Sequence, residues 1–200
     1  MKPHPLLLYS LFAGTLLITL ATNASDAENP KGDFIFELTH VNQPDAEMYL
    51  VSKTNVKKYS EWQNPPVTYW GPSENGVDAE LTYKFPLNHA AEKIHLVANL
   101  ASFNFAYGRG QGTGHSSLWG SKDGKNWILL LDNPVPDRVD SYKTFDELLP
   151  KELLGGNEIW IQIRLRTEDA PNGSYTTAQF SRSSANSIVP VFSIFIKNKE

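Results

Sequence analysis

The chain has 200 residues, with 18 basic and 22 acidic side chains, a formal net charge of -4 and no cysteine. This length suits one domain with a sizeable core. Mild acidity without a cluster of lysine and arginine argues against nucleic-acid binding. The lack of cysteine excludes disulfides, thiolate chemistry and cysteine-based zinc sites.

The first 24 residues have the pattern of a secretory signal peptide. Lys2 gives a positive start, residues 6–20 are mostly apolar, and Thr22-Asn-Ala24 offers small residues for cleavage. An uncleaved anchor is the alternative, although the apolar stretch is short for a membrane span. We therefore expect a secreted, periplasmic or cell-surface protein, with no membrane span in the mature chain.

A polar leader at 25–32 precedes a single domain at 33–200, which we expect to consist almost entirely of strands. Alternation of apolar and polar residues predicts strands at 79–85 and, most clearly, at 158–166. In the second of these, one face carries Ile159, Ile161, Ile163 and Leu165. Enrichment in β-branched and aromatic residues predicts further strands at 33–40, 48–52, 93–105, 117–120, 176–182 and 191–197.

Two irregularities are expected between these strands. The apolar parity changes after Leu100, which predicts a bulge at Ala101-Ser102. Residues 53–78 contain prolines, glycines and tryptophans without a sustained period, so we expect a long irregular connection. In it, Trp62 and Trp70 are either a lid over one end of the domain or packing anchors.

Residues 118–131 predict a β-hairpin. Asp123-Gly124 between two apolar runs favours a type I′ turn, with positive φ at both central residues. Ser121 and Asp123 can hydrogen-bond nearby backbone amides and hold the turn. The apolar run that follows Trp127 predicts that this side chain lies in the core.

A single helical segment is expected, near 144–154. Thr144-Phe-Asp-Glu147 has the form of a capping box, and Gly155-Gly156 marks the end of the segment. Many short strands with hardly any helix indicate an all-β, two-sheet β-sandwich.

Ser121-Lys-Asp-Gly-Lys-Asn-Trp127 resembles the S-x-D-G-x-x-W hairpin of galactose-binding-like domains of the discoidin and carbohydrate-binding-module type. Residues 149–165 and Ala178-Gln-Phe-Ser-Arg182 are similar to segments that such domains carry. The resemblance implies an eight-stranded jelly-roll β-sandwich that is usually non-catalytic and often binds sugars through its end loops. Some of these domains hold a structural calcium, so the resemblance leaves a calcium site open. Their binding loops differ, and no ligand residue is carried over.

Two groups of side chains are candidate ligand sites, because they combine aromatic faces with hydrogen-bonding groups suited to sugar hydroxyls. The polar face of the strand at 158–166 carries Trp160, Gln162, Arg164 and Arg166. The glycine-rich segment at 107–115 and the strand after it carry Tyr107, Arg109, His115 and Trp119. The alternatives are mixed packing on an outer sheet face and a plain surface loop. A phosphate loop is rejected, because the glycine spacing differs from GxGxxG and a strand, not a helix, follows.

No catalytic pattern is found in the sequence. There is no GxSxG elbow, no evident pair of facing carboxylates and no histidine spacing typical of a metal site. Asn172-Gly-Ser174 is a glycosylation sequon in a eukaryotic secretory route. We therefore expect no cofactor and a secreted, monomeric, non-catalytic module that recognises a glycan or cell-surface polymer. The alternatives are a structural or adhesion domain of a cell-envelope assembly and a small secreted glycoside hydrolase.

Overall fold

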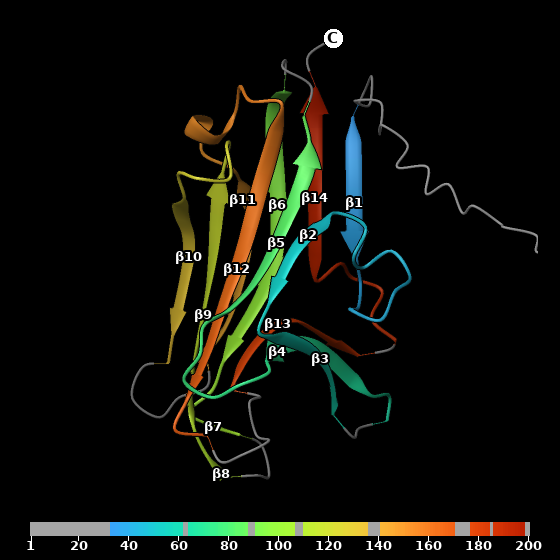
Figure 1. The fold of residues 1–200 in the computed structure, drawn as a ribbon. Helices are drawn as coiled ribbons and strands as arrows, with labels where there is room; N and C mark the ends of the chain where they lie inside the picture. The colour runs from blue at the N-terminus through green and yellow to red at the C-terminus, as the bar shows by residue number, and fades with distance from the viewer. Residues whose placement is uncertain are drawn as a thin grey trace, which may run out of the picture.

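The computed structural model describes residues 33–61, 64–87, 91–106, 110–135, 141–170, 177–184 and 186–198. They form two antiparallel sheets packed face to face (Figure 1). The predicted signal peptide, the polar leader and the sequon at Asn172 lie outside the described residues. In the described part of the chain, no helix is long and apolar enough to cross a membrane.

The first sheet has seven strands in the order β1-β14-β6-β13-β4-β3, with β11 on the other side of β6. Their bounds are β1 (Phe34–Leu38), β14 (Phe192–Asn198), β6 (Ala91–Ser102), β13 (Ala178–Ser184), β4 (Val67–Pro72), β3 (Val56–Glu61) and β11 (Ser141–Leu148). Because β13 and β14 follow one another along one side of β6, β11 is an edge strand of this sheet.

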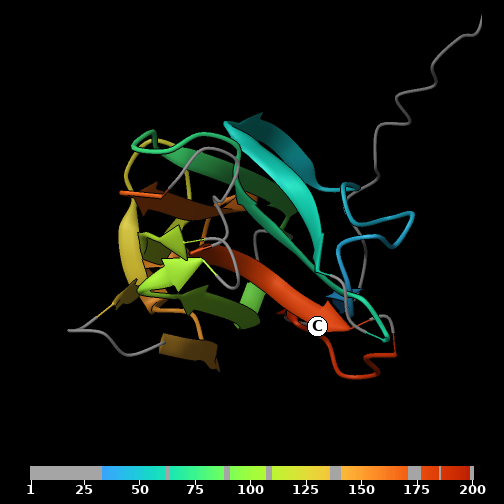
Figure 2. The same cartoon turned by 90° about the horizontal axis from the view of Figure 1, so that it is seen from below.

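The second sheet has five strands in the order β10-β9-β12-β5-β2. Their bounds are β10 (Ile128–Pro134), β9 (Thr113–Ser121), β12 (Glu158–Glu168), β5 (Ala79–Pro86) and β2 (Leu50–Thr54). A short pair, β7 (Phe105–Ala106) and β8 (Gly110–Gln111), and the 3-10 helix η1 (Lys151–Leu153) complete the described elements. Figure 2 views the long strands close to end-on.

The chain passes repeatedly from one sheet to the other, and this strand order defines the fold. β5, β10 and β12 belong to the five-stranded sheet, whereas β6, β11 and β13, the strands that directly follow them along the chain, belong to the seven-stranded sheet. This crossing between sheets gives a two-sheet jelly-roll β-sandwich, as the resemblance implies, but with a seven-stranded and a five-stranded sheet rather than eight strands in all.

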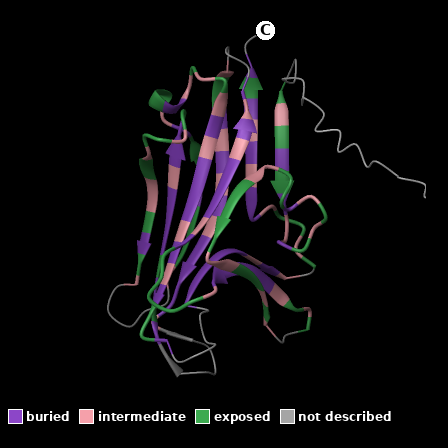
Figure 3. Ribbon diagram, in the orientation of Figure 1, coloured by how far each residue is buried: buried purple, intermediate pink, exposed green. Residues whose placement is uncertain are grey.

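The core lies between the two sheets, where buried residues alternate with more exposed ones along β12 and β14 (Figure 3). The four apolar residues predicted on one face of β12 are each at most 1% exposed. They belong to one buried apolar cluster together with residues of β6 and β14, and aromatic rings form part of this cluster. Ring centroids lie 4.8–6.5 Å apart among Tyr83, Phe85, Phe180 and Phe192. Without disulfides, the sandwich depends on this apolar burial.

The prediction of an irregular connection at 53–78 is wrong, because the segment contains the end of β2 and the β3–β4 hairpin. β4 is buried on both faces, so it lacks the alternation that marks a strand. Trp70 is a core residue at 2% exposure, and Tyr69 stacks on Tyr59 with ring centroids 5.4 Å apart. Trp62 lies outside the described residues.

The predicted bulge at Ala101-Ser102 is absent. β6 pairs continuously with β11 and with β13 as far as Ser102, where the strand ends. The apolar parity changes because Phe103, fully buried, lies beyond the strand end, where its backbone N donates to the Thr177 carbonyl at 2.7 Å.

The capping-box pattern at Thr144–Glu147 does not begin a helix. These residues lie in β11, where Phe145 is buried in the core and the backbone pairs with β6. Long-range pairing and burial here override a local signal. The expected helical turn is η1, within the predicted interval near 144–154.

The β9–β10 turn is longer than predicted and is not of type I′. It runs from Ser121 to Ile128, and only Gly124 of the predicted central pair has positive φ, at 67°. Asp123 Oδ1 accepts hydrogen bonds from the backbone N of Lys125 at 2.9 Å and of Asn126 at 2.8 Å. These hydrogen bonds hold the pKa of Asp123 well below its ordinary value, and the bond from the Asn126 backbone N–H has the largest effect. Ser121 Oγ also donates to Asp123, so both residues hold the turn as expected.

The prediction that Trp127 lies in the core is also wrong. Trp127 is half-buried, and Ile128 and Leu129 after it are 36% and 46% exposed. β10 is an edge strand that only partly covers the core, so an apolar run here does not mean full burial.

Candidate functional site

The outer face of the five-stranded sheet brings parts of the two predicted groups together. β12 pairs with β9 so that the following residues lie opposite one another: Gln162 and Trp119, Arg164 and Ser117, Arg166 and His115. Directly opposed residues of antiparallel strands project from the same face. Tyr107 and Arg109 lie outside the described residues.

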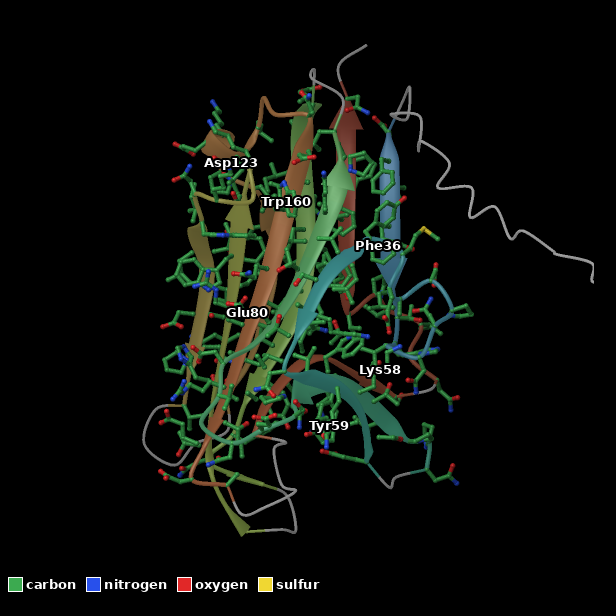
Figure 4. All side chains as sticks on the ribbon, viewed as in Figure 1. Phe36, Lys58, Tyr59, Glu80, Asp123 and Trp160 are labelled. Carbon is green, nitrogen blue, oxygen red and sulfur yellow. The ribbon has the colours of Figure 1, made fainter. Side chains whose placement is uncertain are left out.

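A cavity of about 240 Å³ opens over this part of the sheet. β5 contributes Glu80, which lies opposite Arg164, and Asp78 precedes the strand. The other lining side chains come from β9 and β12, including His115, Trp119 and Arg166. Figure 4 shows Glu80 on the same sheet as Trp160, with Asp123 near the upper end.

Arg164 contacts side chains of all three strands that form the cavity. Its guanidinium carbon is 4.4 Å from the centroid of the Trp119 ring. Its Nε donates to Gln162 Oε1 at 2.6 Å and lies 3.6 Å from Glu80 Oε1. Gln162 is only 7% exposed, and its Nε2 donates to Thr82 Oγ1 at 3.1 Å. The indole and the guanidinium are therefore held in fixed positions before any ligand binds.

The other basic side chains of the face lie beside carboxylates. Arg166 donates to Asp78 Oδ1 at 2.8 Å and to Glu168 Oε1 at 2.7 Å. These hydrogen bonds raise the pKa of Arg166, and the bond to Asp78 has the larger effect. His115 Nε2 lies 2.6 Å from Asp132 Oδ1. The face thus offers many hydrogen-bonding groups while its charges largely balance.

Trp160 lies farther along β12, beneath the β9–β10 turn. A Cβ atom on Gly124 would be 3.1 Å from the Trp160 ring, and Lys84 Nζ is 4.9 Å from the ring centroid. The Trp160 Nε1 donates to Glu158 Oε1 at 2.8 Å. Trp160 does not line the cavity, and its contacts are with the turn and with neighbouring strands.

Asp78, Glu80 and Ser117 belong to the site but were not predicted as members of it. Alternation along 79–85 already puts Glu80 on the polar face of its strand. What the sequence lacks is the pairing of β5 with β12, which sets Glu80 opposite Arg164.

A second cavity, of about 330 Å³, lies on the seven-stranded sheet where β13 departs from β6. Asn99, Tyr142 and Arg182 are among its lining residues. Arg182 is already engaged, because its Nη2 lies 2.9 Å from Glu61 Oε2 and its Nη1 donates to Gln179 Oε1. None of the predicted ligand residues that the structure describes lines this cavity.

The described residues contain no group of three or more histidine, aspartate or glutamate side chains placed to hold a metal ion.

No family model matches the chain, and no curated protein sequence does. Among solved structures, the chain is similar to a carbohydrate-binding module of a Cellvibrio mixtus lichenase in complex with cellotriose, with a TM-score of 0.34 and 8% identity over 84% of this chain and 97% of the other. A structure from a study of carbohydrate-binding module CBM4 gives a TM-score of 0.32 and 11% identity over 86% of each chain. The VP2 particle protein of infectious bursal disease virus gives 0.36 and 11%, over 82% of this chain and 37% of the other.

The strand topology itself assigns the chain to the jelly-roll β-sandwiches, and the candidate site is defined by its own geometry.

Proposed function

We propose that this chain is a secreted, non-catalytic carbohydrate-binding module, and that its binding site is the outer face of the five-stranded sheet around Trp119, Gln162 and Arg164. One observation carries the proposal. Residues far apart in the sequence, on β5, β9 and β12, meet in one cavity that combines an indole with a fixed set of hydrogen-bonding side chains.

The chemistry of the face suits a neutral sugar. Sugars present apolar C–H faces, which pack on aromatic rings, and hydroxyl groups, which bind carboxylates, amides and guanidinium groups. Glu80 and Asp78 can accept from hydroxyls, whereas the guanidinium of Arg164 can donate to them. Gln162 is nearly buried and holds that guanidinium in place. Because Arg164 and Arg166 already face carboxylates, the site offers no uncompensated positive charge for a polyanionic glycan.

A glycan panel tests the proposal directly. Tryptophan fluorescence is followed while soluble polysaccharides and oligosaccharides are added to the protein. We expect saturable binding to at least one neutral glycan. Trp119→Ala should weaken that binding by about 10-fold or more, since aromatic contacts are worth on the order of 1 kcal/mol beyond their buried area.

Trp127→Phe is the matched control, because it removes a tryptophan that does not line the cavity. It should leave the affinity unchanged. If no neutral glycan binds, or if Trp119→Ala and Trp127→Phe bind equally well, the proposed site is wrong. Reducing-sugar release that disappears in Glu80→Gln would show a hydrolase instead.

A further inference from the structure

β11 has a free edge with an unusual composition. The strand pairs with β6 on one side and, among the described residues, with no strand on the other. Tyr142 and Leu148, near its two ends, are 58% and 55% exposed. Exposed edges of this length are sites at which another strand can add to a sheet.

The hydrogen-bond pattern shows which residues face the free edge. The Leu149 backbone N donates to the Ile94 carbonyl at 2.8 Å, so odd-numbered residues of β11 direct their backbone groups toward β6. The even-numbered residues therefore direct theirs away from the sheet, from Tyr142 to Leu148. A second strand that pairs antiparallel with this edge can form about four backbone hydrogen bonds at Thr144 and Asp146 alone.

The strand is complementary to itself in one such register. We propose that the chain forms a two-fold symmetric dimer in which β11 pairs antiparallel with β11 of a second copy, centred on Phe145. This register sets Tyr142 opposite Leu148, Lys143 opposite Glu147 and Thr144 opposite Asp146 of the second copy. Each pair occurs twice because the contact is two-fold symmetric.

The neighbouring registers are worse. Centring on Thr144 would set Tyr142 against Asp146 and Lys143 against Phe145. Centring on Asp146 would place two carboxylates directly opposite each other, which is destabilising. Of these three registers, only the one centred on Phe145 sets the exposed apolar residues Tyr142 and Leu148 opposite each other. The same register sets Lys143 opposite Glu147, so opposite charges meet. The second copy therefore fits this edge better than an unrelated strand, and the dimer that we propose differs from the monomer expected from the sequence.

The symmetry of this dimer has a consequence for binding. The axis runs perpendicular to the seven-stranded sheet, so the five-stranded sheets of both copies face the same side. This consequence, unlike the dimer itself, rests on the proposed function. Two glycan sites on one side would bind a polymer surface with avidity.

The oligomeric state of the full chain, without glycan, tests the dimer. Sedimentation velocity from micromolar to millimolar protein should show conversion from one chain to two. Thr144→Pro should give only the single chain, because proline removes an N–H that faces the free edge and leaves those that face β6. Thr144→Val is the matched control: it also removes the hydroxyl that bonds Asn99, but it keeps the N–H and should still dimerise.

Charge reversal provides a second test that does not depend on proline. Lys143→Glu and Glu147→Lys should each weaken dimerisation by about 10-fold, since each puts like charges opposite each other twice. The double variant should restore it, whereas Lys197→Glu, which changes an exposed charge on β14, should have no effect. Circular dichroism confirms that each variant is folded. The proposal is wrong if the wild-type chain stays monomeric at every concentration. It is also wrong if a dimer forms but neither Thr144→Pro nor charge reversal affects it. In either case, the charges at 143 and 147 would protect the edge from pairing instead.

Discussion

The β9–β10 turn and the cavity on the five-stranded sheet both involve β9, yet their polar groups are used differently. In the turn, Asp123 accepts hydrogen bonds from Lys125, Asn126 and Ser121, all within the same short segment. In the cavity, Arg164 and Glu80 belong to different strands and remain 37% and 39% exposed at their side chains. The turn satisfies its own groups, whereas the cavity keeps groups available to a ligand.

This difference separates a conspicuous motif from a candidate site. The turn attracts attention in the sequence because its residues are close together along the chain. The cavity does not, because its residues become neighbours only through strand pairing. Variants in the two regions should therefore affect different quantities: glycan affinity for the cavity and folding stability for the turn.

The largest expected effect is on glycan affinity. Arg164→Ala removes the cation that stacks on Trp119 and bonds Gln162, so we expect the affinity to fall by about 10- to 50-fold. Isothermal titration calorimetry measures it. Lys84→Ala is the control, because Lys84 is a cation of the same sheet outside the cavity, and its affinity should be unchanged. Equal losses in both variants would mean that the cavity is not the site.

The next effect is on stability, where the turn meets the sheet. Gly124→Ala should lower the free energy of unfolding by about 2 kcal/mol, because φ is 67° and the new Cβ would press on Trp160. Urea denaturation measures this change. Gly155→Ala shares the positive φ but has no atom within 4 Å of its new Cβ, so it should cost about 1 kcal/mol. If the Gly155 variant is as unstable as the Gly124 variant, the Trp160 contact contributes nothing.

A smaller effect is expected on the pH dependence of folding stability. The pKa of Asp123 is lowered in the folded state, so its carboxylate stabilises the fold above the unfolded pKa of about 4, and this contribution is lost as the pH falls toward the folded value. Asp123→Ala should therefore lower the melting temperature by a few degrees at pH 7. The difference from the wild type should shrink steadily below about pH 4. A difference that stays constant from pH 7 to pH 2 would argue against this role.

The smallest effect is expected at Trp127. Because Trp127 is half-buried, Trp127→Phe should change the free energy of unfolding by less than about 1 kcal/mol and leave glycan affinity unchanged. Chemical denaturation and the same titration measure both. A loss of several kcal/mol would place the indole in the core after all.

The fold was predicted where each strand has one buried and one solvent-facing side. The alternation along β5 and β12 identified both strands and the face of β12 that lies in the core. β4 was missed because it is buried on both faces, and β11 because a local capping pattern resembles a helix start. In both cases, contacts with residues distant in the sequence decided the structure.

The candidate site was predicted only in part, for the same reason. Composition identified Gln162, Arg164 and Trp119 as polar and aromatic groups with a suitable chemistry, but as members of two separate groups. Strand pairing joined them and added Glu80.

By itself, the sequence determined the all-β class, the apolar face of β12 and the residues that hold the β9–β10 turn, because these depend on neighbours along the chain. The tertiary structure alone decided which polar residues share a cavity, that Trp160 lies under the turn rather than in the cavity, and that β11 is an edge. Those depend on which strands pair, and pairing is set by burial across the whole sandwich.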